Sequence, residues 1–246
     1  MSEALIRVRD LQVGWGDRIL LSSASFDVER GDVFVILGGS GCGKSTLLRH
    51  LIGLETASVG TISISGVGAP RLEGAAPEYG VMFQSGALFS SMTVGENVGF
   101  ALREWTELPT DAIDAIVKAK LALVGLEGAE GRLPAELSGG MKKRAAIARA
   151  MAFEPKLLFL DEPSAGLDPV SAAELDDLII ALNRGLGLTV VMVTHELESI
   201  FKVGKHCIML DKDSKSIIAS GSPSQLKADS QDSKVHQFFH RQARVR

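Results

Sequence analysis

The residues best suited to chemistry form a glycine-rich run. The run comprises the candidate nucleotide-binding residues Gly38, Gly39, Ser40, Gly41, Cys42, Gly43, Lys44, Ser45 and Thr46. An apolar stretch at 33–37 precedes it and a helical pattern at 47–52 follows it, which is the context that a phosphate-binding loop requires. Glycines let several backbone N–H groups point at one anion, and a helix N-terminus adds partial positive charge. Lys44 can then reach terminal phosphates and the Ser45 hydroxyl can bind Mg²⁺, so the run predicts a nucleoside-triphosphate site.

An acidic pair forms the second candidate site. Asp161 and Glu162 follow an apolar run at 157–160 that is typical of a buried strand. Beside bound phosphates, Asp161 could hold Mg²⁺ through its water shell and Glu162 could polarise an attacking water. Such a pair is common by itself, and its weight comes from the phosphate-binding loop in the same chain. Together the two patterns predict hydrolysis of the bound nucleotide.

A serine–glycine segment predicts a second phosphate site. Ser138, Gly139 and Gly140 stand where an alanine-rich helical pattern begins, so they expose a hydroxyl and two bare backbone N–H groups at a helix start. One chain would then hold two phosphate sites but only one set of candidate Mg²⁺ ligands. Two copies arranged head to tail resolve this mismatch, because each nucleotide would lie between the phosphate-binding loop of one copy and the serine–glycine segment of the other. The pattern therefore predicts a homodimer.

Strands alternate with helices along most of the chain. Besides the strands that precede the two motifs, we expect strands at 6–13, 19–28, 61–64, 80–83 and 188–193. Apolar runs that are buried on both faces predict a mostly parallel sheet. The character changes to helix from residue 86 to about residue 152, which predicts an inserted helical subdomain. The expected fold class is α/β.

Helix ends can be assigned from local signals. Thr110, just after Pro109, is expected to cap a helix that Gly125 ends. Asp168 is expected to cap the next helix, with Pro169 at its first position.

Composition narrows the class of protein. The net charge of this 246-residue chain is −4, from 26 basic and 30 acidic residues, which gives no support to nucleic-acid binding. No apolar run approaches the length of a membrane span and the first ten residues mix charges, so we expect neither a transmembrane segment nor a secretory signal. Cys42 and Cys207 suggest no disulfide framework and no metal-ligand spacing, which favours a reducing, cytosolic compartment.

Taken together, the motifs resemble those of the ATP-binding subunit of ATP-binding-cassette transporters, over essentially residues 5 to 226. Gln84 matches the family's glutamine loop, His195 its switch histidine, and Trp15 the aromatic residue that stacks on adenine. The implied catalytic residues are Lys44, Gln84, Glu162 and His195, and the implied Mg²⁺ ligands are Ser45, Gln84 and Asp161. Trp15 could instead cover an edge of the core, and both interpretations stay open.

The resemblance also implies the fold and its boundaries. A phosphate-loop nucleotidase core of mostly parallel sheet would carry an antiparallel β subdomain and an inserted helical subdomain at about 86–152. The ATP-binding-cassette domain is expected at 1–228, followed by a C-terminal tail at 229–246. ATP and Mg²⁺ are the implied cofactors.

A closer resemblance is to the ATPases of phospholipid and Mce-type transporters. It rests on the segment 84–89, on Met141 where most cassettes have glutamine, on 102–104 before Leu108, and on 232–239. Because methionine has no amide, any role that requires the side-chain amide of glutamine at position 141 is in doubt for this chain. This resemblance implies a lipid transporter whose ATPase lies on the cytosolic face of the inner (cell) membrane. The implied partners are a second ATPase subunit, a membrane permease, an accessory cytosolic subunit and an Mce-type lipid-binding protein, with no nucleic acid.

Two other functions remain open from the sequence. The chain could be the ATPase of an importer for another solute, or a soluble cassette ATPase acting on nucleic acid, the ribosome or cluster assembly. Proteins of the latter kind often carry paired cassettes, coiled-coil insertions or basic surfaces, whereas this chain has one cassette and a net charge of −4. A pull-down from a detergent extract would separate the two classes.

The tail at 229–246 allows two interpretations. Ser222 and Gln225 form a capping-box pattern that starts a short helix, and after it Val235, Phe238 and Phe239 fall on one helical face. That face could fold back on its own subunit, or it could contact the second ATPase subunit or an accessory protein. We expect truncation after residue 228 to leave a folded, ATP-binding subunit with weakened assembly.

Overall fold

The computed structural model describes residues 4–16, 18–71 and 77–241. The chain divides into two compact units. The first joins Met1–Leu72 to Thr189–Arg246, and the second is Glu73–Leu188. Strands and helices alternate in both, and the α/β class expected from the sequence is confirmed. The domain boundaries at 228 and at about 86–152 stay predictions.

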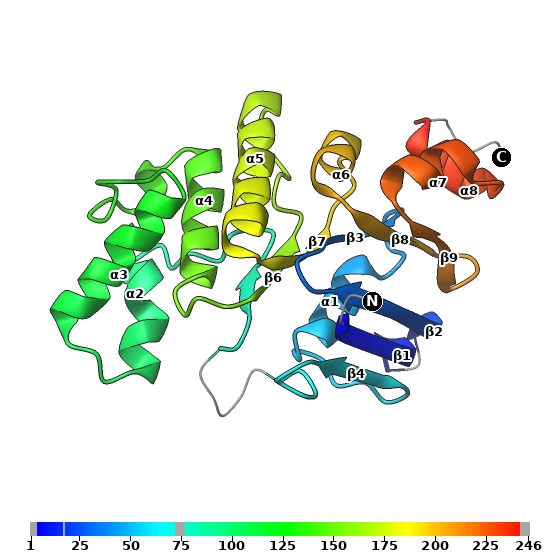
Figure 1. The fold of residues 1–246 in the computed structure, drawn as a ribbon, viewed down its shortest axis with the longest axis horizontal. Helices are drawn as coiled ribbons and strands as arrows, with labels where there is room; N and C mark the ends of the chain where they lie inside the picture. The colour runs from blue at the N-terminus through cyan, green and yellow to red at the C-terminus, as the bar shows by residue number, and fades with distance from the viewer. Residues whose placement is uncertain (1–3, 17, 72–76, 242–246) are drawn as a thin grey trace. The chain divides into compact units, whose positions relative to one another are not determined.

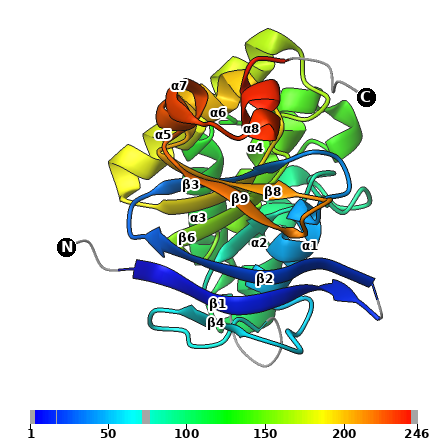
Figure 2. The same ribbon diagram turned by 90° about the vertical axis from the view of Figure 1, so that its right-hand side faces the viewer.

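The first unit contains an antiparallel sheet. Its strands are β1 (Ala4–Trp15), β2 (Arg18–Glu29) and β4 (Thr61–Ile64), in the order β2-β1-β4 (Figure 2). Along β1 the buried side chains include Ile6, Val8, Leu11 and Val13. Ile6 and Val8 follow the period of two that puts side chains on one face of a strand, and so do Leu11 and Val13. The step of three between Val8 and Leu11 coincides with a register shift between β1 and β2, where Asp10 has φ 48°. Trp15 is the last residue of β1 and lies at the end of the sheet.

The same unit contains parallel strands that position the phosphate-binding loop. β3 (Val33–Gly38) lies between β7 (Thr189–Val193) and β8 (His206–Asp211) and is parallel to both. β9 (Ser216–Gly221) pairs antiparallel with β8. All six residues of β3 are buried, as expected for a strand covered on both faces. The helices of this unit are α1 (Lys44–Leu51), α6 (Leu197–Val203), α7 (Pro223–Asp229) and α8 (Ser233–Phe239) (Figure 1).

The second unit is mainly helical. Its strands β5 (Gly80–Met82) and β6 (Leu157–Asp161) are parallel neighbours. Its helices are α2 (Val94–Trp105), α3 (Thr110–Leu123), α4 (Gly139–Ala150) and α5 (Pro169–Leu186), with a 3₁₀ turn, η1 (Pro134–Glu136). α2, α3 and α4 pack on one another, and α4 also packs on α5 (Figure 1). The helical character expected between residues 86 and 152 is thereby confirmed.

One helix cap was assigned correctly and another was not. Asp168 caps α5, because its Oδ1 accepts the backbone N–H groups of Val170 and Ser171 at 3.1 and 3.0 Å. Thr110, however, is the first residue of α3 and not its cap. Pro109 occupies the cap position with an extended backbone, and its carbonyl accepts the first helical N–H groups. The helix therefore begins at Thr110, one residue earlier than a threonine cap would predict.

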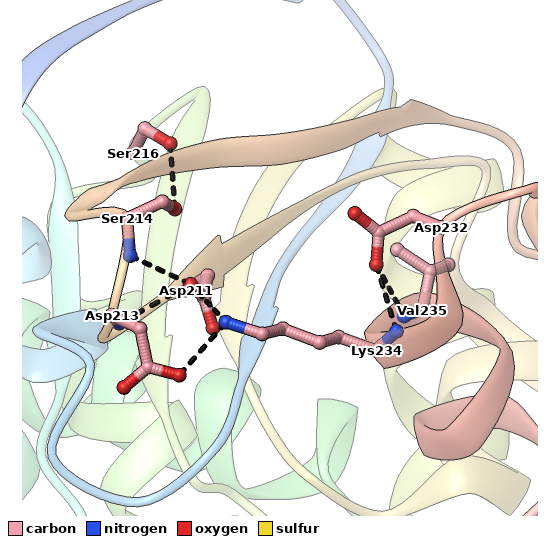
Figure 3. Close-up of polar contacts among 7 residues, drawn as sticks. All are labelled: Asp211, Asp213, Ser214, Ser216, Asp232, Lys234 and Val235. Atoms are coloured by element: carbon pink, nitrogen blue, oxygen red, sulfur yellow. Dashed lines mark hydrogen bonds and ion pairs between the residues drawn. The ribbon is translucent and has the colours of Figure 1, made fainter.

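The segment 233–239 of the tail folds back on its own chain. Val235 and Phe239 of α8 are buried, and the Phe239 ring lies 5.6 Å from the Phe201 ring of α6, centroid to centroid. Lys234 donates to Asp211 at 2.7 Å and to Asp213 at 2.8 Å, at the end of β8 (Figure 3). Of the two interpretations of the tail, the structure therefore favours docking on its own subunit. Residues 242–246, the end of the predicted tail, lie outside the described residues.

Candidate functional site

The phosphate-binding loop has the backbone that its glycines predict. β3 ends at Gly38 and α1 begins at Lys44, and the loop between them contains left-handed residues at Gly38 (φ 144°), Gly41 (75°) and Gly43 (104°). Residues with a Cβ rarely adopt these angles. At Gly38 a Cβ would also lie 2.6 Å from the backbone oxygen of Leu210, so no other residue fits there. The loop therefore curls as an anion cradle must.

Lys44 already lies over this loop. Its ammonium donates to the backbone carbonyls of Gly38 at 2.9 Å and Gly39 at 3.2 Å. In α1 the Leu47 N–H donates to the Gly43 carbonyl at 2.7 Å, so the N-terminus of this helix, with its partial positive charge, lies at the end of the loop. A cradle of N–H groups and an ammonium fits a phosphate. Burial raises the pKa of the Cys42 thiol in the loop, which suits a packing role and not a reactive one.

Trp15 forms part of an open pocket beside the helix that follows the loop. The pocket measures about 420 Å³, and its walls include Trp15, Arg18, Glu55 and His50 of α1. The Trp15 side chain is 52% exposed, and the Arg18 guanidinium lies 5.3 Å from its ring centroid. His50 is buried, with Nδ1 2.9 Å from the Thr46 carbonyl. The exposed part of the ring is thus open to a flat ligand, and the role of Trp15 stays a prediction.

The acidic pair stands at the end of β6 in the second unit. Asp161 is half-buried as the last residue of the strand, and Glu162 is 8% exposed. Glu162 has φ 47°, in the left-handed region that residues with a side chain seldom occupy. Such conformations cluster at functional positions, because the surrounding structure has to hold them. No residue pattern around Glu162 predicted this backbone geometry.

Lys143 is a residue near the acidic pair that the motifs did not single out. Its ammonium, on α4, donates to the backbone carbonyl of Gln84 at 2.5 Å and to that of Glu162 at 3.3 Å. Burial lowers the pKa of Lys143, and the nearby carboxylates of Asp161 and Glu162 partly oppose that effect. A lysine after the serine–glycine segment is unremarkable as a sequence signal, since its contacts depend on segments far away along the chain.

The serine–glycine segment begins α4 as expected. Ser138 is the N-cap, and its hydroxyl accepts the Met141 N–H at 3.3 Å. Ser138 and Gly139 are exposed and Gly140 is half-buried, so the start of the helix is open to a ligand. An exposed helix N-terminus attracts anions, and this one carries a hydroxyl beside it.

Gln84 and His195 complete the predicted set. In the second unit, Gln84 is exposed just after β5. Because β5 and β6 are parallel neighbours, Gln84 and Asp161 both lie at the carboxyl ends of these strands. In the first unit, His195 is 57% exposed just after β7, which is parallel to β3 and so ends at the same edge as the phosphate-binding loop. Each unit thus carries part of the predicted set at the carboxyl ends of its parallel strands.

A dedicated metal cage is not part of the described structure. Over residues 4–16, 18–71 and 77–241, no group of three or more His, Cys, Asp or Glu side chains could hold a metal ion. Mg²⁺ is usually held by one or two carboxylates together with substrate phosphates and water. The oxygen donors predicted from the sequence are Ser45 in the first unit and Gln84 and Asp161 in the second, and their role as Mg²⁺ ligands stays a prediction. Among the helices that the structure describes, none is long and apolar enough to cross a membrane.

Comparisons with known proteins agree on one family. The model of the ABC transporter family matches residues 21–165. The Intermembrane phospholipid transport system ATP-binding protein MlaF of Escherichia coli (strain K12) is 41% identical over 240 residues, which cover 96% of this chain and 88% of that protein. The Probable ribonucleotide transport ATP-binding protein mkl of Mycobacterium leprae (strain TN) is 39% identical, over 96% of this chain and 68% of that protein.

A solved structure shows the same fold. The structure of cbiO1 from Clostridium perfringens, described as part of the ABC transporter complex cbiONQ, has a TM-score of 0.81 and 30% sequence identity. The match covers 92% of each chain. The shared architecture therefore extends well beyond the segment that the family model matches.

Proposed function

This chain belongs to the ABC transporter family as an ATPase that binds ATP, and from that premise we propose that it energises transport of phospholipid, or of a related lipid, through a separate membrane permease. The observation that carries the proposal is the 41% identity to MlaF over 96% of this chain, because that relative is named for phospholipid transport. The likeness to mkl, named for ribonucleotide transport, favours a second candidate, the ATPase of a transporter for another solute.

The nucleotide is proposed to bind through its phosphates and its base. Lys44 and the glycine loop would hold the phosphates, and Trp15 would stack on adenine. The left-handed glycines and the Lys44 ammonium support the first role, and the exposed indole at the pocket wall supports the second. Mg²⁺, when bound, would neutralise charge on the phosphate oxygens, with Ser45, Gln84 and Asp161 as its proposed protein ligands.

Hydrolysis is proposed to depend on Glu162 and His195. The Glu162 carboxylate would accept a proton from the attacking water, and the His195 ring would donate a hydrogen bond to the terminal phosphate. The position of Glu162 after β6, directly beyond the proposed metal ligand Asp161, supports the first role. The Glu162→Gln variant should bind ATP and fail to hydrolyse it, because an amide cannot take up that proton. Hydrolysis at the parent rate in this variant would rule the role out.

Two copies are proposed to assemble head to tail around two nucleotides. The exposed N-terminus of α4, with Ser138 and Gly139, offers a phosphate site apart from the glycine loop. In the dimer it would face the nucleotide held by the other copy. ATP would then bridge the two copies, and loss of the γ-phosphate on hydrolysis would release them. Glu162→Gln should therefore accumulate as an ATP-bound dimer, which size-exclusion chromatography can detect.

The permease is proposed to contact the surface that follows Gln84. The side chains of Phe89 and Phe100 are 47% and 42% exposed, and their ring centroids lie 5.2 Å apart. Arg149 lies over the Phe89 ring, 5.8 Å from its centroid, and donates a short hydrogen bond to the Ala87 carbonyl. Exposed aromatic clusters of this kind commonly mark contact sites for other proteins. The proposed location is therefore the cytosolic face of the inner membrane, peripheral to the permease.

The decisive experiment is to identify what the protein binds in its own membrane. A tagged chain is purified in mild detergent, and mass spectrometry identifies the co-purified proteins and lipids. A permease, an Mce-type lipid-binding protein, an accessory subunit and bound phospholipid are the expected result. A permease with a nucleotide or another solute as its substrate would support the second candidate. Recovery of ribosomes or DNA without a permease would contradict a transport role.

A further inference from the structure

Lys143 is a buried cation of the second unit. Its side chain is 8% exposed, and its ammonium donates to two main-chain carbonyls, those of Gln84 and Glu162. Burying an ammonium is costly unless hydrogen bonds satisfy it. Lys120, the comparably buried lysine of the same unit, instead pairs with the carboxylate of the exposed Glu154. The contacts of Lys143 are thus unusual in joining one charge to the backbone of two other segments.

The two segments are those to which hydrolysis and permease contact are assigned above. Gln84 follows β5 and leads into the exposed surface at Phe89, while Glu162 follows β6. Lys143 itself lies in α4, the helix that Ser138 begins. One ammonium therefore connects the helix of the serine–glycine segment, the glutamine loop and the backbone of the proposed catalytic carboxylate.

The Glu162 backbone needs such a connection. Its φ of 47° lies in a sparsely populated region, which persists where neighbouring groups hold it in place. The Glu162 carbonyl accepts the Ala165 N–H at 3.2 Å, in the turn after β6, and the Lys143 ammonium at 3.3 Å. The carboxylate projects from this main chain, so groups that bond the carbonyl restrict the backbone from which the carboxylate extends.

We propose that Lys143 is a positioning residue for ATP hydrolysis. It holds the main chain of Glu162 in its left-handed conformation and joins that main chain to Gln84, so that movement of the glutamine loop is passed to the carboxylate. The inference rests on the role proposed for Glu162 above. It does not depend on which substrate the transporter carries.

The test compares Lys143→Met with Lys143→Arg in the purified transporter complex. Methionine has a similar length and cannot donate, whereas arginine keeps the charge and can donate to two acceptors. We expect Lys143→Met to lower kcat by about tenfold to a hundredfold, since small misplacements of catalytic groups have effects of that order. The KM for ATP should change by less than about twofold, because ground-state binding is untouched. Lys143→Arg should recover most of the lost kcat.

Lys142→Met is the matched control, because it makes the same chemical change at the neighbouring position of α4. It should leave kcat and KM unchanged. A second readout is the ratio of the ATPase rate in the complex to that of the isolated subunit. This ratio should fall in Lys143→Met, because the connection to the glutamine loop is lost, and it should be normal in Lys142→Met.

The outcomes separate this inference from the proposed function. A normal kcat in Lys143→Met, while Glu162→Gln is inactive, overturns the positioning role and leaves the role of Glu162 standing. Parent-like hydrolysis by Glu162→Gln would instead refute the proposed function. Two results with Lys143→Met would assign Lys143 a purely structural role and would also overturn the inference. One is loss of ATP binding, and the other is a fall of more than about 10 °C in the melting temperature of the isolated subunit.

Discussion

The docking of α8 allows a quantitative prediction about two adjacent phenylalanines. Phe239 is 3% exposed and packs against Phe201, whereas Phe238 is only half-buried and meets Phe239 edge to face. Replacing a fully buried phenylalanine with alanine costs about 3–5 kcal/mol in a protein core. Phe239→Ala should therefore destabilise the subunit much more than Phe238→Ala.

The size of the effect is limited by the position of α8. A seven-residue helix close to the C-terminus can detach before the rest of the subunit unfolds, so the loss cannot exceed the free energy with which it docks. Burial of Phe239 and Val235 contributes about 1.5–3 kcal/mol for each side chain before the cost of ordering the segment. We therefore expect a loss of about 2 kcal/mol for Phe239→Ala, which lowers the melting temperature by about 4–8 °C in a chain of this size.

The assay is thermal unfolding of the isolated subunit, followed by circular dichroism, with the recovery of the complex from membranes measured in parallel. Phe238→Ala is the matched control and should lower the melting temperature by less than about 2 °C. Truncation after residue 228 should lower the melting temperature at least as much as Phe239→Ala. This expectation replaces the prediction from the sequence that truncation would weaken mainly the assembly of the complex. Unchanged melting temperatures together with reduced recovery of the complex in both variants would refute self-docking as the role of the tail.

Three further predictions concern the phosphate sites and the ion pair of the tail. Lys44→Ala should abolish most ATPase activity of the purified complex, because the phosphates lose a mobile cationic donor; near-normal turnover would contradict the assignment of the loop. In mixed dimers with Ser138→Arg in one copy and Lys44→Ala in the other, the head-to-tail arrangement keeps one intact site and roughly half the activity, whereas sites built within one chain would give none. Burial raises the pKa of Asp211, but hydrogen bonds from Lys234 and Ser214 outweigh it and hold that pKa at about 2. Because the folded-state pKa is depressed, its stabilisation is present at neutral pH and is lost on acidification. The melting temperature of Lys234→Met should therefore differ most from the parent at neutral pH and converge with it between about pH 5 and pH 2; a difference independent of pH would exclude the ion pair as its cause.

Local signals in the sequence predicted much of the framework. The glycine run, flanked by an apolar strand and a helical pattern, placed β3 and the start of α1, and Asp168 with Pro169 placed the start of α5. These signals succeed because each depends on bonds between residues that are close in the chain. Thr110 shows where such a signal fails, since Pro109 has the extended backbone that the cap requires and threonine is simply the next residue.

The rest depends on contacts that no local pattern contains. The short strands β8 and β9 and helix α6 were not predicted as separate elements. Lys143 bonds a carbonyl 59 positions away, so this contact could not be predicted from the residues around it. The apolar face of the tail was visible in the sequence, but the surface that covers it, around Phe201, was not.

The bonds of Lys44 to its own loop bear on how the protein discriminates among nucleotides. The Lys44 ammonium is already hydrogen-bonded to the carbonyls of Gly38 and Gly39, so a ligand that binds it has to displace them. Charged phosphate oxygens are stronger acceptors than neutral carbonyls and can win this exchange. Adenosine could occupy the pocket beside Trp15 without disturbing those bonds. Affinity should then rise in a step once a ligand carries enough phosphates to reach the ammonium.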